Sequence, residues 1–365
     1  GDAPSKPFGD ASEYTWAPDG KSIVASIRVA GKSEAWSTNF DLFRINVDGS
    51  GTPINPTRTR PPWPSTPLFS ADGKTLYYRA TTRPGFEADR FGLRALELGS
   101  GKLQQIAANW DRSADGITLS EDGKTLFTTA QDMGQHPLFG IDLGTEQVRK
   151  VVGEGTVSAF DIAGNSLAFT RNTLQSGDQV FTTTLAGEPL RAITPSTSER
   201  LPDVAMGASQ QFSFKGWNGE IVHGFVVKPW DFEEGKTYPV AFLIHGGPQG
   251  SFGNSWSYRW NPQTYAGQGY AVVMIDFHGS TGYGQACADS ISQDRGGKPR
   301  EDFPQGWPEA QATSAFLDAG KACALGASYG GYMVNWIAGN WNEPWKCLVN
   351  HDGVFDTFGM GYSTE

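Results

Sequence analysis

A repeated turn constrains the fold of this sequence more than any other feature. The tripeptide Asp-Gly-Lys begins at Asp19, Asp72 and Asp122, so its copies are 53 and 50 residues apart. A degenerate fourth turn, Gly164-Asn165, follows about 42 residues later. Each turn lies between two short runs of strand-forming residues, a combination that strongly favours a β-hairpin. The first two hundred residues therefore predict hairpins at a regular period.

Each predicted hairpin is followed by more strand-like sequence, at residues 42–47, 91–98, 138–143 and 180–185. About four strands in 40–50 residues is typical of one blade of a β-propeller. About four blades are visible, which we interpret as part of a larger ring. A β-sandwich is the alternative, but a sandwich has no reason to reuse one turn at one period.

The pattern changes after residue 205. Residues 240–244 and 271–275 are continuous apolar runs, as expected of strands buried on both faces of a parallel sheet. Segments 262–268 and 309–317 have the composition of helices that could cover such a sheet. We therefore predict two domains, a β-propeller part at 1–205 and an α/β-hydrolase part at 206–365.

Charge and hydropathy exclude two classes of partner. The 365 residues carry 29 basic and 39 acidic side chains, a formal charge of −10, with no basic block. Nucleic-acid-binding surfaces concentrate positive charge, so we expect no nucleic acid partner. The longest apolar run, residues 270–275, is far shorter than the roughly 20 residues of a membrane-spanning helix.

The motif with the clearest chemistry is Gly326-Ala-Ser-Tyr-Gly330. It follows the apolar run 322–325 and opens a helix-like stretch at 332–338, which is the context that a GxSxG nucleophile elbow requires. Its alternative is a glycine-rich turn with a surface serine. We predict that Ser328 is a catalytic nucleophile.

A second motif, His245-Gly-Gly-Pro248, ends the predicted strand 240–244. Acyl transfer needs N–H donors aimed at the oxygen that becomes negative in the tetrahedral intermediate. A loop of this type supplies one donor and the residue after the serine supplies the other. We therefore assign the oxyanion hole to the backbone N–H groups of Gly247 and Tyr329. His245 is expected to anchor the loop rather than to act as the general base.

The three cysteines, Cys287, Cys323 and Cys347, form no CxxC pair and no metal-binding spacing. At least one of them is unpaired within the chain. We expect Cys323 and Cys347, at the starts of strand-like segments, to be small buried hydrophobic residues.

Several segments together resemble the prolyl oligopeptidase family of serine peptidases. The resemblance is carried by residues 326–333, 245–253 and 277–284, and it implies a β-propeller joined to an α/β-hydrolase domain. Residues 349–356 and 322–328 are most similar to dipeptidyl peptidases of the family, which remove dipeptides from free N-termini. Acylaminoacyl peptidases share nearly all of these motifs.

One departure concerns the rest of the catalytic triad. A serine hydrolase of this fold needs an Asp and then a His after the serine, but only 37 residues follow Ser328. We expect that the sequence is truncated and that both residues lie beyond Glu365. A local triad of His351 with Asp352 or Asp356 is the alternative, although the resemblance places that segment beside the substrate pocket.

A second departure lies at 303–308, where relatives usually have a helix. Pro304 and Pro308 are not expected to fit together inside a regular helix.

Substrate contacts are predicted from the loop 83–90 and the tail. A dipeptidyl peptidase must bind a free α-ammonium group, and Glu87 and Asp89 offer carboxylates for it, unless the loop is simply solvated. Phe355 and Phe358 are candidates for the pocket of the residue before the cut bond, with core packing as the alternative.

The sequence thus predicts a serine exopeptidase that releases dipeptides through an acyl-enzyme, without metal or cofactor. Its partners would be short peptides, with a homo-oligomer left open, and the resemblance implies a periplasmic or secreted location. One alternative is an acylaminoacyl peptidase or oligopeptidase of the same family. Another is a catalytically dead binding protein built on the same two domains.

Overall fold

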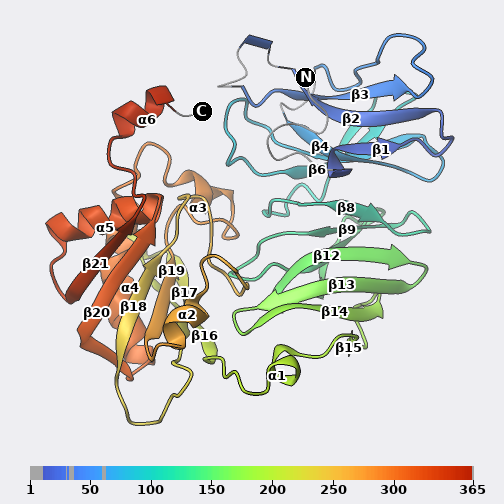
Figure 1. Ribbon diagram of the computed structural model, residues 1–365. Helices are drawn as coiled ribbons and strands as arrows, with labels where there is room; N and C mark the ends of the chain where they lie inside the picture. The colour runs from blue at the N-terminus through green and yellow to red at the C-terminus, as the bar shows by residue number, and fades with distance from the viewer. Residues whose placement is uncertain (1–10, 30, 33–36, 60–62, 364–365) are drawn as a thin grey trace.

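In the described residues, four small antiparallel sheets form the amino-terminal half of the molecule (Figure 1). The computed structural model describes residues 11–29, 31–32, 37–59 and 63–363. The elements of this half, in chain order, are η1 (Ala11–Glu13), β1 (Tyr14–Trp16), β2 (Ser22–Arg28), β3 (Phe40–Asn46), β4 (Pro64–Phe69), β5 (Thr75–Ala80), β6 (Gly92–Glu97), β7 (Leu103–Ile106), β8 (Ile117–Leu119), β9 (Thr125–Thr129), β10 (Leu138–Asp142), β11 (Val148–Val152), β12 (Thr156–Ala163), β13 (Ser166–Thr173), β14 (Ser176–Thr184) and β15 (Arg191–Ala192).

The predicted repeat is confirmed at its turns. In each Asp-Gly-Lys copy the aspartate carboxylate accepts a hydrogen bond from the lysine N–H, at 2.9, 3.0 and 3.1 Å. The intervening glycine has a positive φ of 67°, 69° and 70°, which favours a residue without Cβ. Sheets two to four have four strands each, as expected. The first has three, β1-β2-β3, with a single bridge from Arg44 to Ile54 beyond them.

Each core cluster of this half lies between neighbouring sheets. Leu42 of the first sheet and Leu76 of the second belong to one cluster. Leu93 of the second and Leu126 of the third belong to another, and Phe127 and Phe169 join the third sheet to the fourth. The sheets therefore pack face to face in series, which is a propeller-like arrangement.

A six-stranded mixed sheet with helices on both faces forms the second half. Its strand order is β16-β17-β19-β18-β20-β21; β18, β19, β20 and β21 are parallel, while β16 and β17 run antiparallel to their neighbours. The elements are α1 (Thr197–Arg200), β16 (Ser209–Lys215), η3 (Trp217–Gly219), β17 (Ile221–Val227), β18 (Tyr238–Ile244), α2 (Pro262–Ala266), β19 (Ala271–Asp276), α3 (Gln285–Asp289), α4 (Lys298–Thr313), β20 (Leu317–Ala327), α5 (Tyr329–Asn340), β21 (Trp345–His351) and α6 (Thr357–Ser363). Among the described helices, none is long and apolar enough to cross a membrane.

The main core lies between this sheet and the helices α4 and α5. Phe242 of β18 is fully buried there, with its ring 5.8 Å from Phe303, 6.0 Å from Trp307 and 5.3 Å from Trp345. Burying a side chain of this size contributes about 1.5–3 kcal/mol to stability. The opposite face packs on α2 through Ala266.

Helix α4 corrects the prediction for residues 303–317. Both Pro304 and Pro308 lie inside it, and it ends at Thr313 rather than at 317. Each proline removes one N–H donor, but the adjacent Phe303 and Trp307 are buried in the core and hold the helix against the sheet. Tertiary burial thus outweighs the local cost of the two prolines.

The cysteines correct a second prediction. Cys323 and Cys347 are not separate buried hydrophobic residues but form a disulfide. They face each other in the parallel register of β20 and β21, with Cα atoms 4.7 Å apart. Cys287 is the free thiol, and burial raises its pKa to about 11.

Candidate active site

Ser328 lies between β20 and α5 in a conformation that few residues other than glycine adopt. Its φ is 54° and its ψ is −119°. Such a conformation costs about 1–3 kcal/mol and persists only where neighbouring contacts impose it. Here the Ser328 N–H donates to the carbonyl of His351 at 3.1 Å, and its own carbonyl accepts from Tyr332 and Val354.

The glycines on either side of the serine have no room for a side chain. A Cβ on Gly326 would overlap the backbone of Gly330, and a Cβ on Gly330 would overlap the carbonyl of Ile244. This close approach brings the end of β18 against the start of α5. The GxSxG spacing thus follows from packing between two neighbouring strands and one helix.

The loop that follows β18 lies directly beside the serine. A Cβ on Gly246 would be 3.3 Å from the Cβ of Ser328, and Gly247 has a φ of 121°. Among the described residues, neither the Gly247 N–H nor the Tyr329 N–H donates to a hydrogen-bond partner. The assignment of these two amides to the oxyanion hole stays a prediction.

His245 anchors this loop, as predicted. Its Nδ1 lies 2.7 Å from the carbonyl of Gly246, its Nε2 lies 2.9 Å from Ser280 Oγ, and its ring stacks on Phe277. Burial lowers the pKa of His245, which outweighs the opposing effect of Asp276, so the ring stays neutral near pH 7.

A cavity of about 630 Å³ opens at Ser328 and is also lined by His351, Asp352 and Trp260. His351 Nε2 lies 3.4 Å from Asp352 Oδ2, so the two members of the predicted local pair do meet. Within the described residues, however, no histidine is hydrogen-bonded to Ser328 Oγ. The contact of His351 with the serine is made by its backbone carbonyl.

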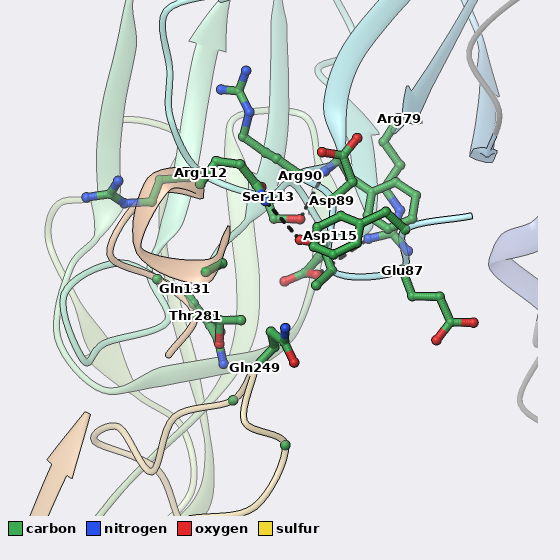
Figure 2. Close-up of a pocket in the computed structure, with 18 of the residues that line it drawn as sticks. Arg79, Glu87, Asp89, Arg90, Arg112, Ser113, Asp115, Gln131, Gln249 and Thr281 are labelled. Atoms are coloured by element: carbon green, nitrogen blue, oxygen red, sulfur yellow. Dashed lines mark hydrogen bonds and ion pairs between the residues drawn. The ribbon is translucent and has the colours of Figure 1, made fainter. Parts of the chain in front are cut away.

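A larger cavity, of about 1070 Å³, lies between the small sheets and the mixed sheet (Figure 2). Gly247 and Gln249 line it from the β18 loop, and Glu87 lines it from the loop between β5 and β6. Gly250 lines both cavities, so the β18 loop forms their shared wall. Figure 2 shows the carboxylate of Glu87 apart from the other labelled side chains, and Glu87 is exposed.

Asp89 differs from Glu87, although both were predicted to bind an ammonium group. Its buried carboxylate accepts hydrogen bonds from Thr82 N, Thr82 Oγ1 and Arg83 N, and a fourth from Arg83 Nε at 2.7 Å. Burial acts to raise the pKa of Asp89, but these bonds outweigh it and the pKa is lowered. Asp89 is therefore a charged group that holds its own loop.

The same loop is fastened to the second half of the chain. Arg83 makes two hydrogen bonds to the carboxylate of Asp289 in α3, at 2.9 and 2.7 Å. Gln285, one turn earlier in α3, donates to the carbonyl of Ala88. Glu87 is thus carried by a loop that is held at both of its ends.

Phe355 and Phe358 do not pack in the core. They are 89% and 74% exposed, and neither lines the two cavities described above. The core-packing alternative is therefore wrong for both. The phenyl ring of Phe358 contacts Tyr362, one turn further along α6.

Sequence reasoning missed Asp276, whose carboxylate holds the β18 loop in place through hydrogen bonds. Its buried carboxylate accepts from Ser251 Oγ and Tyr283 OH, each at 2.6 Å, and from the Phe252 N–H at 3.3 Å. Asp276 is the last residue of β19, and a lone acidic residue at the end of an apolar strand was the available signal.

Part of the chain matches a known family. The model described as "Prolyl oligopeptidase family" matches residues 256–365, a range that includes the elbow at Ser328.

Two curated relatives are similar along nearly the whole chain. The dipeptidyl-peptidase 5 proteins of Trichophyton equinum and Arthroderma otae are each 37% identical, over alignments 378 and 372 positions long. Each alignment covers 97% of this chain and 51% of the relative. The chain thus spans about half the length of the curated relatives it matches.

Solved structures share the fold at lower identity. A Pyrococcus horikoshii acylaminoacyl peptidase has a TM-score of 0.77 and 21% identity, covering 93% of this chain and 52% of that one. A puromycin hydrolase has a TM-score of 0.72 and 15% identity, covering 96% and 53%.

Proposed function

We propose that the protein is a serine exopeptidase of the prolyl oligopeptidase family, whose model matches residues 256–365, and that it releases dipeptides from free peptide N-termini. The strained elbow at Ser328, flanked by two glycines that admit no Cβ, carries the proposal. The names of the relatives, dipeptidyl-peptidase 5, support the dipeptide product. The finer fold we propose is a four-bladed part of a β-propeller at 1–205 and an α/β-hydrolase part at 206–365.

In the proposed mechanism Ser328 Oγ attacks the carbonyl carbon of the second residue of the substrate, so that the bond to the third residue breaks. A general base takes the hydroxyl proton, and the carbonyl oxygen becomes an oxyanion that accepts from Gly247 N–H and Tyr329 N–H. The amino terminus of α5, directly behind Ser328, favours that negative charge. The protonated base gives its proton to the leaving nitrogen as the C–N bond breaks, which frees the amine, and water then hydrolyses the acyl-enzyme ester and restores the serine hydroxyl.

The test of the nucleophile is covalent labelling of the intact protein. Wild type should react with a fluorophosphonate probe and cleave a dipeptidyl reporter, while Ser328→Ala should do neither, because the attacking oxygen is gone. Persistent labelling of Ser328→Ala would refute the assignment. An unlabelled, inactive wild type would favour the alternative of a dead binding protein.

We further propose that Glu87 recognises the α-ammonium group of the substrate. It is the carboxylate of its loop that is not already committed to Arg83, and it faces the cavity that Gly247 also lines. A hydrogen bond to a charged group is worth about 1.5–3 kcal/mol.

Glu87→Gln should therefore raise KM for a free-amine dipeptidyl reporter roughly 10- to 100-fold and leave kcat nearly unchanged. The matched control is Glu234→Gln, an exposed carboxylate outside both cavities. The N-acetylated reporter should be a poor substrate for wild type. Preference for the acetylated reporter would instead support an acylaminoacyl peptidase, an alternative that the structural likeness to such an enzyme keeps open.

A location outside the cytosol, periplasmic or secreted, is part of the proposal. The disulfide between Cys323 and Cys347 supports it, because such bonds persist in oxidising compartments.

A further inference from the structure

Side-chain contacts hold the β18 loop, residues 245–254, at three points, and the Thr281 N–H also donates to the carbonyl of Gly250 at 2.9 Å. His245 fixes its start through Ser280, and Asp276 fixes Ser251 and Phe252 near its middle. Both of these anchors belong to the second half of the chain. The third anchor, Asn254 at the end of the loop, bonds instead to the small sheets.

Asn254 uses all four of its hydrogen-bonding groups on residues of the first half. Its N–H donates to Gly134 O at 2.7 Å, and its carbonyl accepts from Thr156 Oγ1 at 3.0 Å. Its side-chain Oδ1 accepts from Leu174 N at 2.9 Å, and its Nδ2 donates to Gln135 Oε1 at 3.0 Å. One residue therefore contacts the loop between β9 and β10 in the third sheet, and both β12 and the loop between β13 and β14 in the fourth.

The residues around Asn254 pack closely, both in the β18 loop and in the small sheets. Gly253 has a φ of 57°, and a Cβ there would be 3.2 Å from the carbonyl of Gly134. Gln135 Oε1 also accepts from Gly155 N at 2.8 Å, so the glutamine that meets Asn254 is itself fixed. Beyond Asn254, the Trp256 N–H donates to Asn172 Oδ1 at 2.9 Å.

We propose that Asn254 is a positioning residue through which the small sheets set the geometry of the oxyanion hole. This inference rests on the proposed function, because it takes Gly247 as an oxyanion donor. Gly247 lies seven residues before Asn254 in the same loop, and its neighbour Gly246 lines the cavity at Ser328 together with Gly250, Ser251 and Phe252. The carboxamide of Asn254 supplies both the acceptor for Leu174 N and the donor for Gln135 Oε1.

The consequence is that docking of the two halves and oxyanion stabilisation are coupled. When the small sheets hold Asn254, the end of the loop cannot drift away from Ser328. When this anchor is lost, His245 and Asp276 still hold the rest of the loop, so the loop stays folded but is less well placed. A displacement of about 1 Å can cost up to 10²-fold in rate.

The test compares Asn254→Ala with Gln211→Ala in the intact protein. Gln211 of β16 also bonds the first half, through Met133 O at 2.8 Å, but it lies outside the β18 loop. Asn254→Ala should lower kcat about tenfold with little change in KM. Gln211→Ala should keep the wild-type kcat, although it too removes one bond between the halves.

A second measurement distinguishes a misplaced oxyanion donor from a general loss of stability in the variant. A peptide aldehyde, which forms a tetrahedral adduct with the serine, should bind Asn254→Ala about tenfold more weakly, matching the loss in kcat. Asn254→Asp, which keeps the acceptor for Leu174 N, should recover part of both losses.

Equal kcat values for Asn254→Ala and wild type, or equal losses in both alanine variants, would overturn the inference. A loss confined to KM would overturn it as well. Failure of the proposed function looks different, because wild type itself would then neither turn over substrate nor take up the fluorophosphonate probe.

Discussion

At the scale of single residues, the site depends on two glycines, because no side chain fits at their positions. Gly326 and Gly330 lie so close to neighbouring backbone that even one methyl group has no space, and this lets the strained Ser328 sit between them. Because the obstructing atoms are backbone carbonyls of other segments, a rotamer change cannot relieve the overlap.

Gly330→Ala should therefore destabilise the protein by about 2 kcal/mol or more and abolish activity, since the added Cβ collides with the carbonyl of Ile244. The matched control is Gly339→Ala in the same helix, where a Cβ meets nothing within 4 Å. That control should stabilise the protein by up to about 1 kcal/mol through helix propensity. Denaturant unfolding measures both, and equal free energies of unfolding for the two variants would contradict the packing argument.

At the scale of elements, one buried histidine joins the end of β19 to helix α4 and to the turn before β17. His278, just after β19, has Nδ1 2.8 Å from Asp302 of α4 and Nε2 3.1 Å from Glu220, which precedes β17. Burial acts to lower the pKa of His278, but the hydrogen bonds and charges of Asp302 and Glu220 outweigh it and raise the pKa above 6.5. The two carboxylates thus favour the imidazolium form of His278 more in the folded protein than in the unfolded chain.

A raised folded-state pKa fixes the sign of the pH dependence. His278 should contribute its full stabilisation below pH 6.5, its ordinary pKa, and lose it as the pH rises through the folded-state pKa. The difference in free energy of unfolding between wild type and His278→Gln should therefore shrink with increasing pH. Glu220→Gln should move this loss to lower pH, and a difference that does not change with pH would refute the assignment.

Some features of the helices and strands could be predicted from the sequence and others could not. The hairpins and the strand–serine–helix motif were predictable because each is encoded within a few consecutive residues. The two prolines of α4 and the disulfide were not, because Phe303 and Trp307 hold the helix by burial, and Cys323 meets Cys347 only through the register of β20 and β21.

At the scale of the whole molecule, polar contacts between loops join the two halves around the larger cavity. Arg83 and Asp289 are 206 residues apart in the sequence, yet they form a two-point ion pair across it. No local pattern links such distant residues. Sequence alone also does not show that the carboxylate of Asp89 turns back onto Thr82 and Arg83 of its own loop. The candidate nucleophile was predictable from sequence, whereas the residues that position its surroundings, such as Asp276 and Asn254, were not.

Each Asp-Gly-Lys turn has a hydrogen bond within itself, from the lysine N–H to the aspartate carboxylate. A gene duplication that adds about fifty codons can therefore introduce a new sheet without redesigning the turns beside it. An added sheet would still lack an apolar face that fits its neighbours, because each core cluster of this half is shared by two sheets. After such a duplication, selection would favour substitutions at the buried leucines and phenylalanines, while the turn sequences could stay unchanged.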